Sequence, residues 1–189
     1  MCGLTTRSSP TSLALRASAA AERRRWASMR ALLLIPLLSG CAAVTGTPIL
    51  TPTSYGRITF GDQLVHVEKL LGEKAPPLGD DDEVHCRQIT FSAYPEILFM
   101  VEKGVITRAE SAKPVPTSSG FTVGASLEGI RRSVPAAVIE GHKYEPTGHY
   151  VTITSKDGKS ALVMEEGGGS ITDVRGGLIP SVQYVEGCL

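Results

Sequence analysis

The sequence predicts an α+β fold in which two tandem repeats, each a helix followed by an antiparallel meander of strands, share one core. Three observations predict it: short segments recur in the same order, apolar residues recur at helical spacing, and short apolar runs alternate with turn residues. The recurring pairs are residues 59–64 and 122–127, residues 98–100 and 162–164, and residues 104–107 and 169–172. The offset drifts from 63 to 65 residues, which is too long for a solenoid unit and indicates a pair of small subdomains.

Each repeat is predicted to begin with a helix. In the first repeat the apolar stripe consists of Leu64, Val67, Leu70 and Leu71, and Gly72 suits the C-terminal cap. In the second repeat the stripe consists of Leu127, Ile130 and Val134, with Val138 as a further candidate, and Pro135 is expected to end the helix at the preceding residue.

Short strands are predicted to follow each helix. The first set covers residues 84–91, 97–102 and 105–110, and the second covers residues 150–154, 161–165 and 170–175, with 181–185 as an additional edge strand. Lys103-Gly104 and Asp157-Gly158 are suitable turns. The predicted organisation is therefore a first α/β repeat at 55–112, a linker at 113–120 and a second α/β repeat at 121–189.

The first 40 residues have the features of a signal region. Arginines at 23–25 and 30 precede an apolar run at 31–38, which is too short to span a bilayer. Leu38-Ser39-Gly40-Cys41 resembles the lipobox of bacterial lipoproteins. This resemblance implies cleavage before Cys41 and acylation of that cysteine, since several acyl chains are needed for stable anchoring.

Further details of the N-terminus follow from the same resemblance. Ala42 at the position after the lipidated cysteine implies the periplasmic face of the outer membrane. Met29 is an alternative translation start, in which case residues 1–28 would be an artefact of start-site assignment. Residues 41–54 are rich in Thr, Pro and small residues and are predicted to be a flexible tether.

Composition argues against two classes of function. Six arginines and one glutamate precede Cys41, which leaves 13 Lys and Arg against 18 Asp and Glu in the mature chain. A mildly acidic protein is a poor candidate for nucleic-acid binding, which needs a basic surface. Because aromatic residues are only 5% of the chain, an aromatic platform for sugars or bases is also not expected.

The cysteines predict one disulfide. If Cys41 carries lipid, Cys86 and Cys188 form the remaining pair, and the periplasm is an oxidising compartment. The alternative is a metal ligand or a catalytic thiol. Neither cysteine lies in a CxxC motif, and no histidine spacing resembles a zinc site, so the disulfide is the prediction.

Residues 142–150 contain the candidate binding residues His142, Tyr144, His149 and Tyr150. A loop rich in Tyr, His and Gly suits partner recognition, because tyrosine supplies contact area at low entropic cost. A metal or anion held by His142, Tyr144 and His149 is the sharper alternative, but no carboxylate cluster completes such a site. Ordinary loop chemistry is the third interpretation.

No catalytic, metal or cofactor site is predicted. The acidic run at 80–83 lacks the spacing of a calcium loop and is interpreted as a solvated turn. Glu165 and Glu166 are adjacent in a predicted strand and should point to opposite faces. No nucleophile elbow is present, and residues 167–170 lack the lysine of a phosphate loop. The expectation is therefore a protein that is not an enzyme.

The helix-plus-meander pattern resembles the beta-lactamase inhibitor protein (BLIP) family and the small SmpA/OmlA-type lipoproteins of outer-membrane assembly. The residues that carry the resemblance are 58–61 with Leu64, Val67 and 71–72, their counterparts 122–124 with Leu127 and Ile130, and His85-Cys86-Arg87. Gly61-Asp62-Gln63 and Gly124-Ala125-Ser126 replace the usual Gly-Met-Thr start.

Together these features predict an outer-membrane lipoprotein that binds a protein partner of the cell envelope, as an assembly component or an inhibitor-like module. The membrane contact is through lipid on Cys41. Two alternatives remain: a structural envelope protein without a discrete ligand, and a small-ligand or metal-binding protein that uses His142 and His149.

Overall fold

The computed structural model describes residues 46–79 and 85–188. The predicted signal region 1–40, Cys41 with the start of the predicted tether, and the acidic run 80–83 lie outside the described residues. The elements are β1 (Ser54–Tyr55), β2 (Ile58–Thr59), α1 (Leu64–Leu71), β3 (Cys86–Ile89), β4 (Leu98–Glu102), β5 (Val105–Ser111), α2 (Leu127–Ser133), β6 (Val138–Gly141), β7 (His149–Thr154), β8 (Ser160–Gly167), β9 (Ser170–Leu178) and the 3₁₀ helix η1 (Ser181–Gln183).

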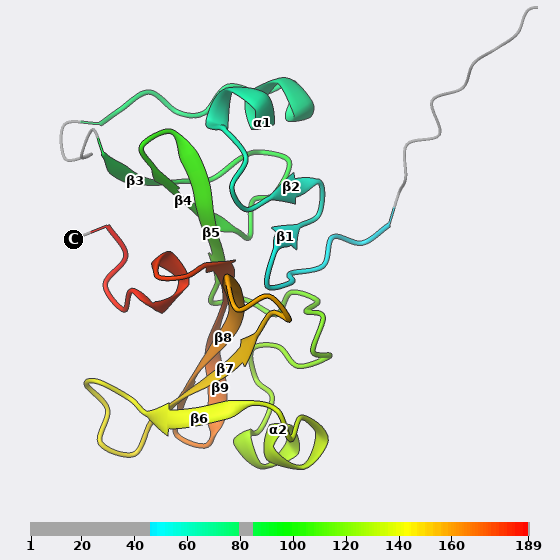
Figure 1. Cartoon of the computed structure of the whole chain (residues 1–189), viewed down its shortest axis with the longest axis vertical. Helices are drawn as coiled ribbons and strands as arrows, with labels where there is room; N and C mark the ends of the chain where they lie inside the picture. Colours follow the sequence, from blue (N-terminus) through cyan, green and yellow to red (C-terminus); the bar gives the residue numbers. More distant parts are fainter. Residues whose placement is uncertain (1–45, 80–84, 189) are drawn as a thin grey trace, which may run out of the picture. The chain divides into compact units, whose positions relative to one another are not determined.

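The described chain is mostly β, and the predicted α+β fold of two helix-plus-meander repeats is wrong. Seven strands form one antiparallel sheet in the order β3-β4-β5-β9-β8-β7-β6, and β1 and β2 form a separate two-stranded sheet. In Figure 1 α1 lies beside the β3–β5 part of the large sheet and α2 lies at the start of β6. The two helices are only eight and seven residues long.

The prediction failed because hydrophobic periodicity identifies strands but not the strands with which they pair. β5 and β9 are long strands, and they pair with each other from Arg108 opposite Gly177 to Ser111 opposite Val174. This pairing satisfies the backbone groups that two separate meanders would leave exposed at their edges. The result is one continuous sheet.

Two further expectations about individual elements are also wrong. Val138 belongs to the edge strand β6 and not to the second helical stripe. Residues 181–185 were expected to add an edge strand, but Ser181–Gln183 form a 3₁₀ turn instead. Two predictions about the helix ends are confirmed. Gly72 caps α1 in the left-handed conformation (φ 69°), and α2 ends at Ser133, ahead of Pro135.

Both helices begin with the same backbone arrangement. Gly61 and Gly124 have positive φ angles of 105° and 88°. The N–H of Gly61 donates to the carbonyl of Ile106, and the N–H of Gly124 donates to the carbonyl of Ile171, each over 2.8 Å. This local likeness anchors each helix to a β-hairpin of the single sheet.

One face of the sheet carries the main hydrophobic core. Buried side chains from both parts of the sheet meet there, and the helices add Val67 and Ile130. Phe99 lies at the centre of an aromatic group, with ring centroids of Tyr55 and Phe91 at 6.2 and 5.6 Å. The strand residues of this core include Val101, Ile106, Val151, Leu162, Met164 and Val174. The side chains on the opposite face of the sheet do not belong to this core.

None of the described helices is long and apolar enough to cross a membrane.

Candidate functional site

The candidate binding residues lie on the loop between β6 and β7 (residues 142–148, here the β6–β7 loop) and at the start of β7. β6 is the last strand of the seven-stranded sheet. The loop is closed by a hydrogen bond from the His142 N–H to the Gly148 carbonyl (2.9 Å) and one from the Gly148 N–H to the Glu145 carbonyl (2.9 Å).

The side chain of His142 holds this loop in shape. Its Nδ1 accepts hydrogen bonds from the backbone N–H groups of Tyr144 (3.1 Å) and Glu145 (3.0 Å). The ring hydrogen is therefore assigned to Nε2, which donates to Glu165 Oε1 at 2.8 Å. The ring also stacks on Tyr150, with centroids 4.5 Å apart and an interplanar angle of 24°. His142 is a positioning residue for the loop.

His149 makes a separate contact. Its Nδ1 lies 2.7 Å from Glu166 Oε2, and the buried Glu166 also accepts the N–H of Gly169 at 2.5 Å. The two histidines thus bind different carboxylates and do not converge on one site. Across the described residues 46–79 and 85–188, no group of three or more His, Cys, Asp or Glu side chains could hold a metal ion.

Tyr144 is the residue of the predicted four that projects into solvent. It is 56% exposed. The Nζ of Lys143 lies 4.8 Å from the centroid of its ring and 3.0 Å from Glu186 in the C-terminal segment (residues 180–188). Tyr150, in contrast, lies under His142 on one side, with the Arg175 guanidinium 5.6 Å from its centroid. The structure therefore separates one exposed aromatic ring from three partly buried side chains, those of His142, His149 and Tyr150.

The second face of the sheet carries a charged cluster that sequence reasoning missed. Arg108, which is 2% exposed, lies 2.6 Å from Glu110 and donates hydrogen bonds to the carbonyls of Ser181 and Tyr184 at 3.3 and 2.8 Å. Arg175 donates to the carbonyl of Val182 at 3.1 Å. These bonds fasten the C-terminal segment over the polar side chains.

Charged residues flank one apolar residue in 108–110 and in 173–175, a pattern that marks the second face as polar there. It predicts a solvated face and gives no sign of the segment that covers it. Cys188, near the end of that segment, forms a disulfide with Cys86 in β3. The structure thus contains the pairing that the cysteine count predicted.

Asp173 has the most perturbed carboxyl group of this cluster. Burial, assisted by the neighbouring carboxylates of Glu110 and Glu165, raises its pKa to about 7, against the opposing effect of Arg175 and Arg108. Its Oδ1 is buried without a hydrogen-bond partner and lies 3.9 Å from the nearer Arg175 nitrogen. The ionised form of Asp173 is therefore costly in the folded protein.

This shift predicts that stability falls as the pH rises from about 4 to about 7, because the folded chain then binds more protons than the unfolded chain. The Asp173→Asn variant removes this titration. At pH 8 it is expected to be more stable than the parent protein by about 1–3 kcal/mol, and the gain should shrink at pH 5. Urea unfolding at the two pH values measures this. An equal difference at both pH values would contradict the assignment.

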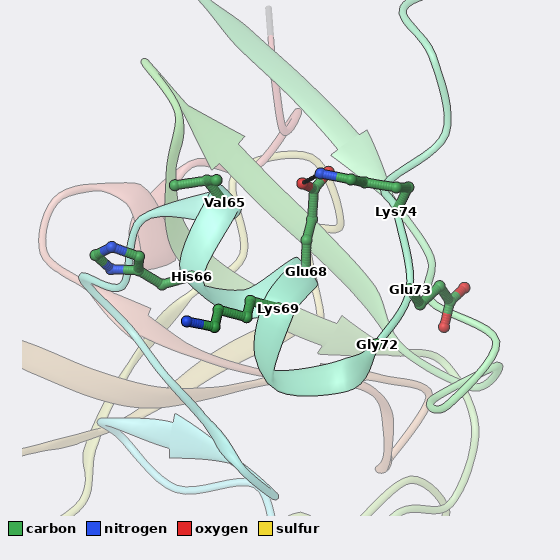
Figure 2. A pocket seen from close by; sticks show the side chains of 7 residues that line it. All are labelled: Val65, His66, Glu68, Lys69, Gly72, Glu73 and Lys74. Carbon is green, nitrogen blue, oxygen red and sulfur yellow. Dashed lines mark hydrogen bonds and ion pairs between the residues drawn. The ribbon is translucent and has the colours of Figure 1, made fainter.

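A surface pocket of about 490 Å³ lies on the outer side of α1. Figure 2 shows the side chains that line it, with the ion pair between Glu68 and Lys74 (2.7 Å) at one end. Val65 on this side is strongly exposed. The pocket contains none of the predicted binding residues, and none of its lining residues has a buried unpaired side-chain atom that would direct a ligand.

The geometry therefore favours the β6–β7 loop over the charged cluster and the α1 pocket as the candidate binding surface. The charged cluster is used internally to hold the C-terminal segment. Comparison with protein-family models, curated proteins and solved structures finds no match to this chain.

Proposed function

We propose that this chain is a lipid-anchored envelope protein that binds a protein partner through Tyr144 and the β6–β7 loop. The lipobox-like 38–41 motif supports the anchor, with acylation on Cys41 and location on the periplasmic face of the outer membrane. Binding without catalysis is proposed because both nitrogens of His142 are engaged in hydrogen bonds that support the loop, and Nδ1 of His149 is engaged with Glu166 of β8.

The observation that carries the proposal is an exposed tyrosine on a loop whose shape is already set. Tyrosine is enriched among residues that dominate binding energy at interfaces. A loop ordered before binding loses less conformational entropy when a partner docks. Here the two hydrogen bonds to His142 Nδ1 order the backbone next to Tyr144, while the ring itself remains 56% exposed.

The test is crosslinking of the full-length protein in intact cells, followed by detergent extraction and mass spectrometry. Replacing Tyr144 with alanine is expected to reduce recovery of the partner by at least about tenfold, which corresponds to loss of an interface residue worth more than about 1.4 kcal/mol. Because Tyr144 is exposed, the melting temperature should not change. The matched control is Val65→Ala, an equally exposed apolar residue on α1.

The two outcomes separate the alternatives. Loss of the partner with Tyr144→Ala but not with Val65→Ala would support the binding role. Recovery of no specific protein by the parent chain would contradict it and favour a structural envelope role. The same extracts report the anchor, because an unacylated Cys41 peptide would contradict the lipoprotein assignment.

A further inference from the structure

β6 offers unpaired backbone groups at the edge of the sheet. In its antiparallel pairing with β7, Val138 lies opposite Thr152 and Glu140 opposite Tyr150, and the His142 N–H donates to the Gly148 carbonyl. Hydrogen-bonded positions alternate along such a pair. The N–H and C=O groups of Ile139 and Gly141 therefore point away from β7, and within the described residues they have no partner.

The side chains of β6 define what can pair there. Val138 is 54% exposed and Glu140 is also exposed, and both lie on the same face of the strand. Glu140 forms no ion pair among the described residues. Glu145 on the β6–β7 loop is a further exposed carboxylate, and so is Glu186, which pairs with Lys143 at 3.0 Å. The edge is therefore apolar at one end and acidic toward the loop.

Charge also argues against a second copy of this chain as the occupant. Antiparallel self-pairing that joins the outward groups of Ile139 to those of Gly141 in a second copy would place Glu140 opposite the same residue of that copy, and like charges directly opposite each other destabilise a strand pair. A strand with a lysine or arginine at that position would instead form an opposite-charge pair.

We propose that the edge of β6 binds an extended, basic segment of the protein partner as an additional strand. This inference rests on the proposed function and names the chemistry of the partner. The backbone groups of Ile139 and Gly141 supply the main-chain hydrogen bonds, as in other cases of strand addition. Val138 contacts an apolar side chain of the segment, Glu140 contacts a cationic one, and Tyr144 lies beyond the end of the strand.

The other edge of the sheet is less suited to this role. β3 carries Cys86, whose disulfide ties the end of the C-terminal segment to that strand. Gly187 of the segment lies close to Gln88 of β3. A Cβ added at Gly187 would lie 3.2 Å from the side-chain amide nitrogen of Gln88. Within the described residues, no backbone hydrogen bond or disulfide ties another segment to the outer edge of β6.

The experiment uses the full chain in detergent and a labelled, threonine-rich hexapeptide that carries one valine and one lysine two positions apart, and hence on the same face of the strand. Binding is followed by fluorescence anisotropy. The matched peptides replace lysine with glutamate or carry N-methyl groups on alternate backbone amides. On the protein side, Gly141→Pro removes an outward N–H, and Gly141→Ala is the control because it keeps that N–H and has room for the methyl group.

The lysine peptide is expected to bind at least about tenfold more tightly than the glutamate and N-methylated peptides. Gly141→Pro should weaken its binding by at least about tenfold, whereas Gly141→Ala should change it less than about twofold. Equal binding of the lysine and N-methylated peptides would overturn the inference even if Gly141→Pro does not fold, because the peptide comparison uses the parent protein.

Failure of the strand-addition inference can be distinguished from failure of the proposed function. If the in-cell partner depends on Tyr144 but the three peptides bind alike, strand addition is wrong and the loop interface stands. If no in-cell partner exists, the proposed function fails whatever the peptides do.

Discussion

Replacing Arg108 with methionine is expected to lower the free energy of unfolding by about 3–5 kcal/mol. Methionine retains much of the side-chain length, so the loss comes from the charge and not from a large void. The substitution leaves the Glu110 carboxylate without its partner at 2.6 Å and removes the donors to the carbonyls of Ser181 and Tyr184. Urea unfolding at pH 7 measures the change.

Two controls define the cause. Glu110→Gln combined with Arg108→Met removes both charges, so the double variant should be more stable than Arg108→Met alone by about 1–3 kcal/mol. Lys113→Ala breaks the exposed ion pair with Glu96 and should cost less than about 1 kcal/mol. A double variant as unstable as the sum of the single variants would show that the pair of charges is not coupled.

Replacing both Cys86 and Cys188 with serine is expected to lower the free energy of unfolding by about 3–5 kcal/mol. The disulfide joins residues 102 positions apart, so it restricts a long loop of the unfolded chain. It also fixes the end of the segment that covers the charged face.

Denaturation with and without a reducing agent measures this contribution. The parent protein should lose stability on reduction by about the same amount as it does on the double substitution, and the double variant should not respond to the reducing agent. A difference below about 1 kcal/mol between the parent and the double variant would mean that the bonds from Arg108 and Arg175 hold the segment without the disulfide.

Sequence reasoning reached the supporting residues of the binding loop but not their roles. His142, Tyr144, His149 and Tyr150 could be selected by residue type. That His142 and Tyr150 lie stacked against each other, and that Tyr144 alone of the four projects outward, depends on Glu165 in another strand. Since a carboxylate 23 positions away provides the second hydrogen bond of His142, no local pattern could reveal it.

The sequence by itself determined the local features. These are the helix ends at Gly72 and before Pro135, most of the strands, and the pairing of Cys86 with Cys188, which follows from counting cysteines. Each depends on neighbouring residues or on composition, which the sequence displays directly.

Only the tertiary structure decided how the strands pair. The contact of β5 with β9 merges the two predicted repeats into one sheet, and it leaves β6 as an edge. The covering of Arg108 and Arg175 by the C-terminal segment was likewise invisible, because alternating charge marks a polar face whether water or a protein segment lies over it. Strand pairing joins residues far apart in the chain. Its energy comes from giving partners to the backbone groups at strand edges and to buried charges, and hydrophobic periodicity encodes neither.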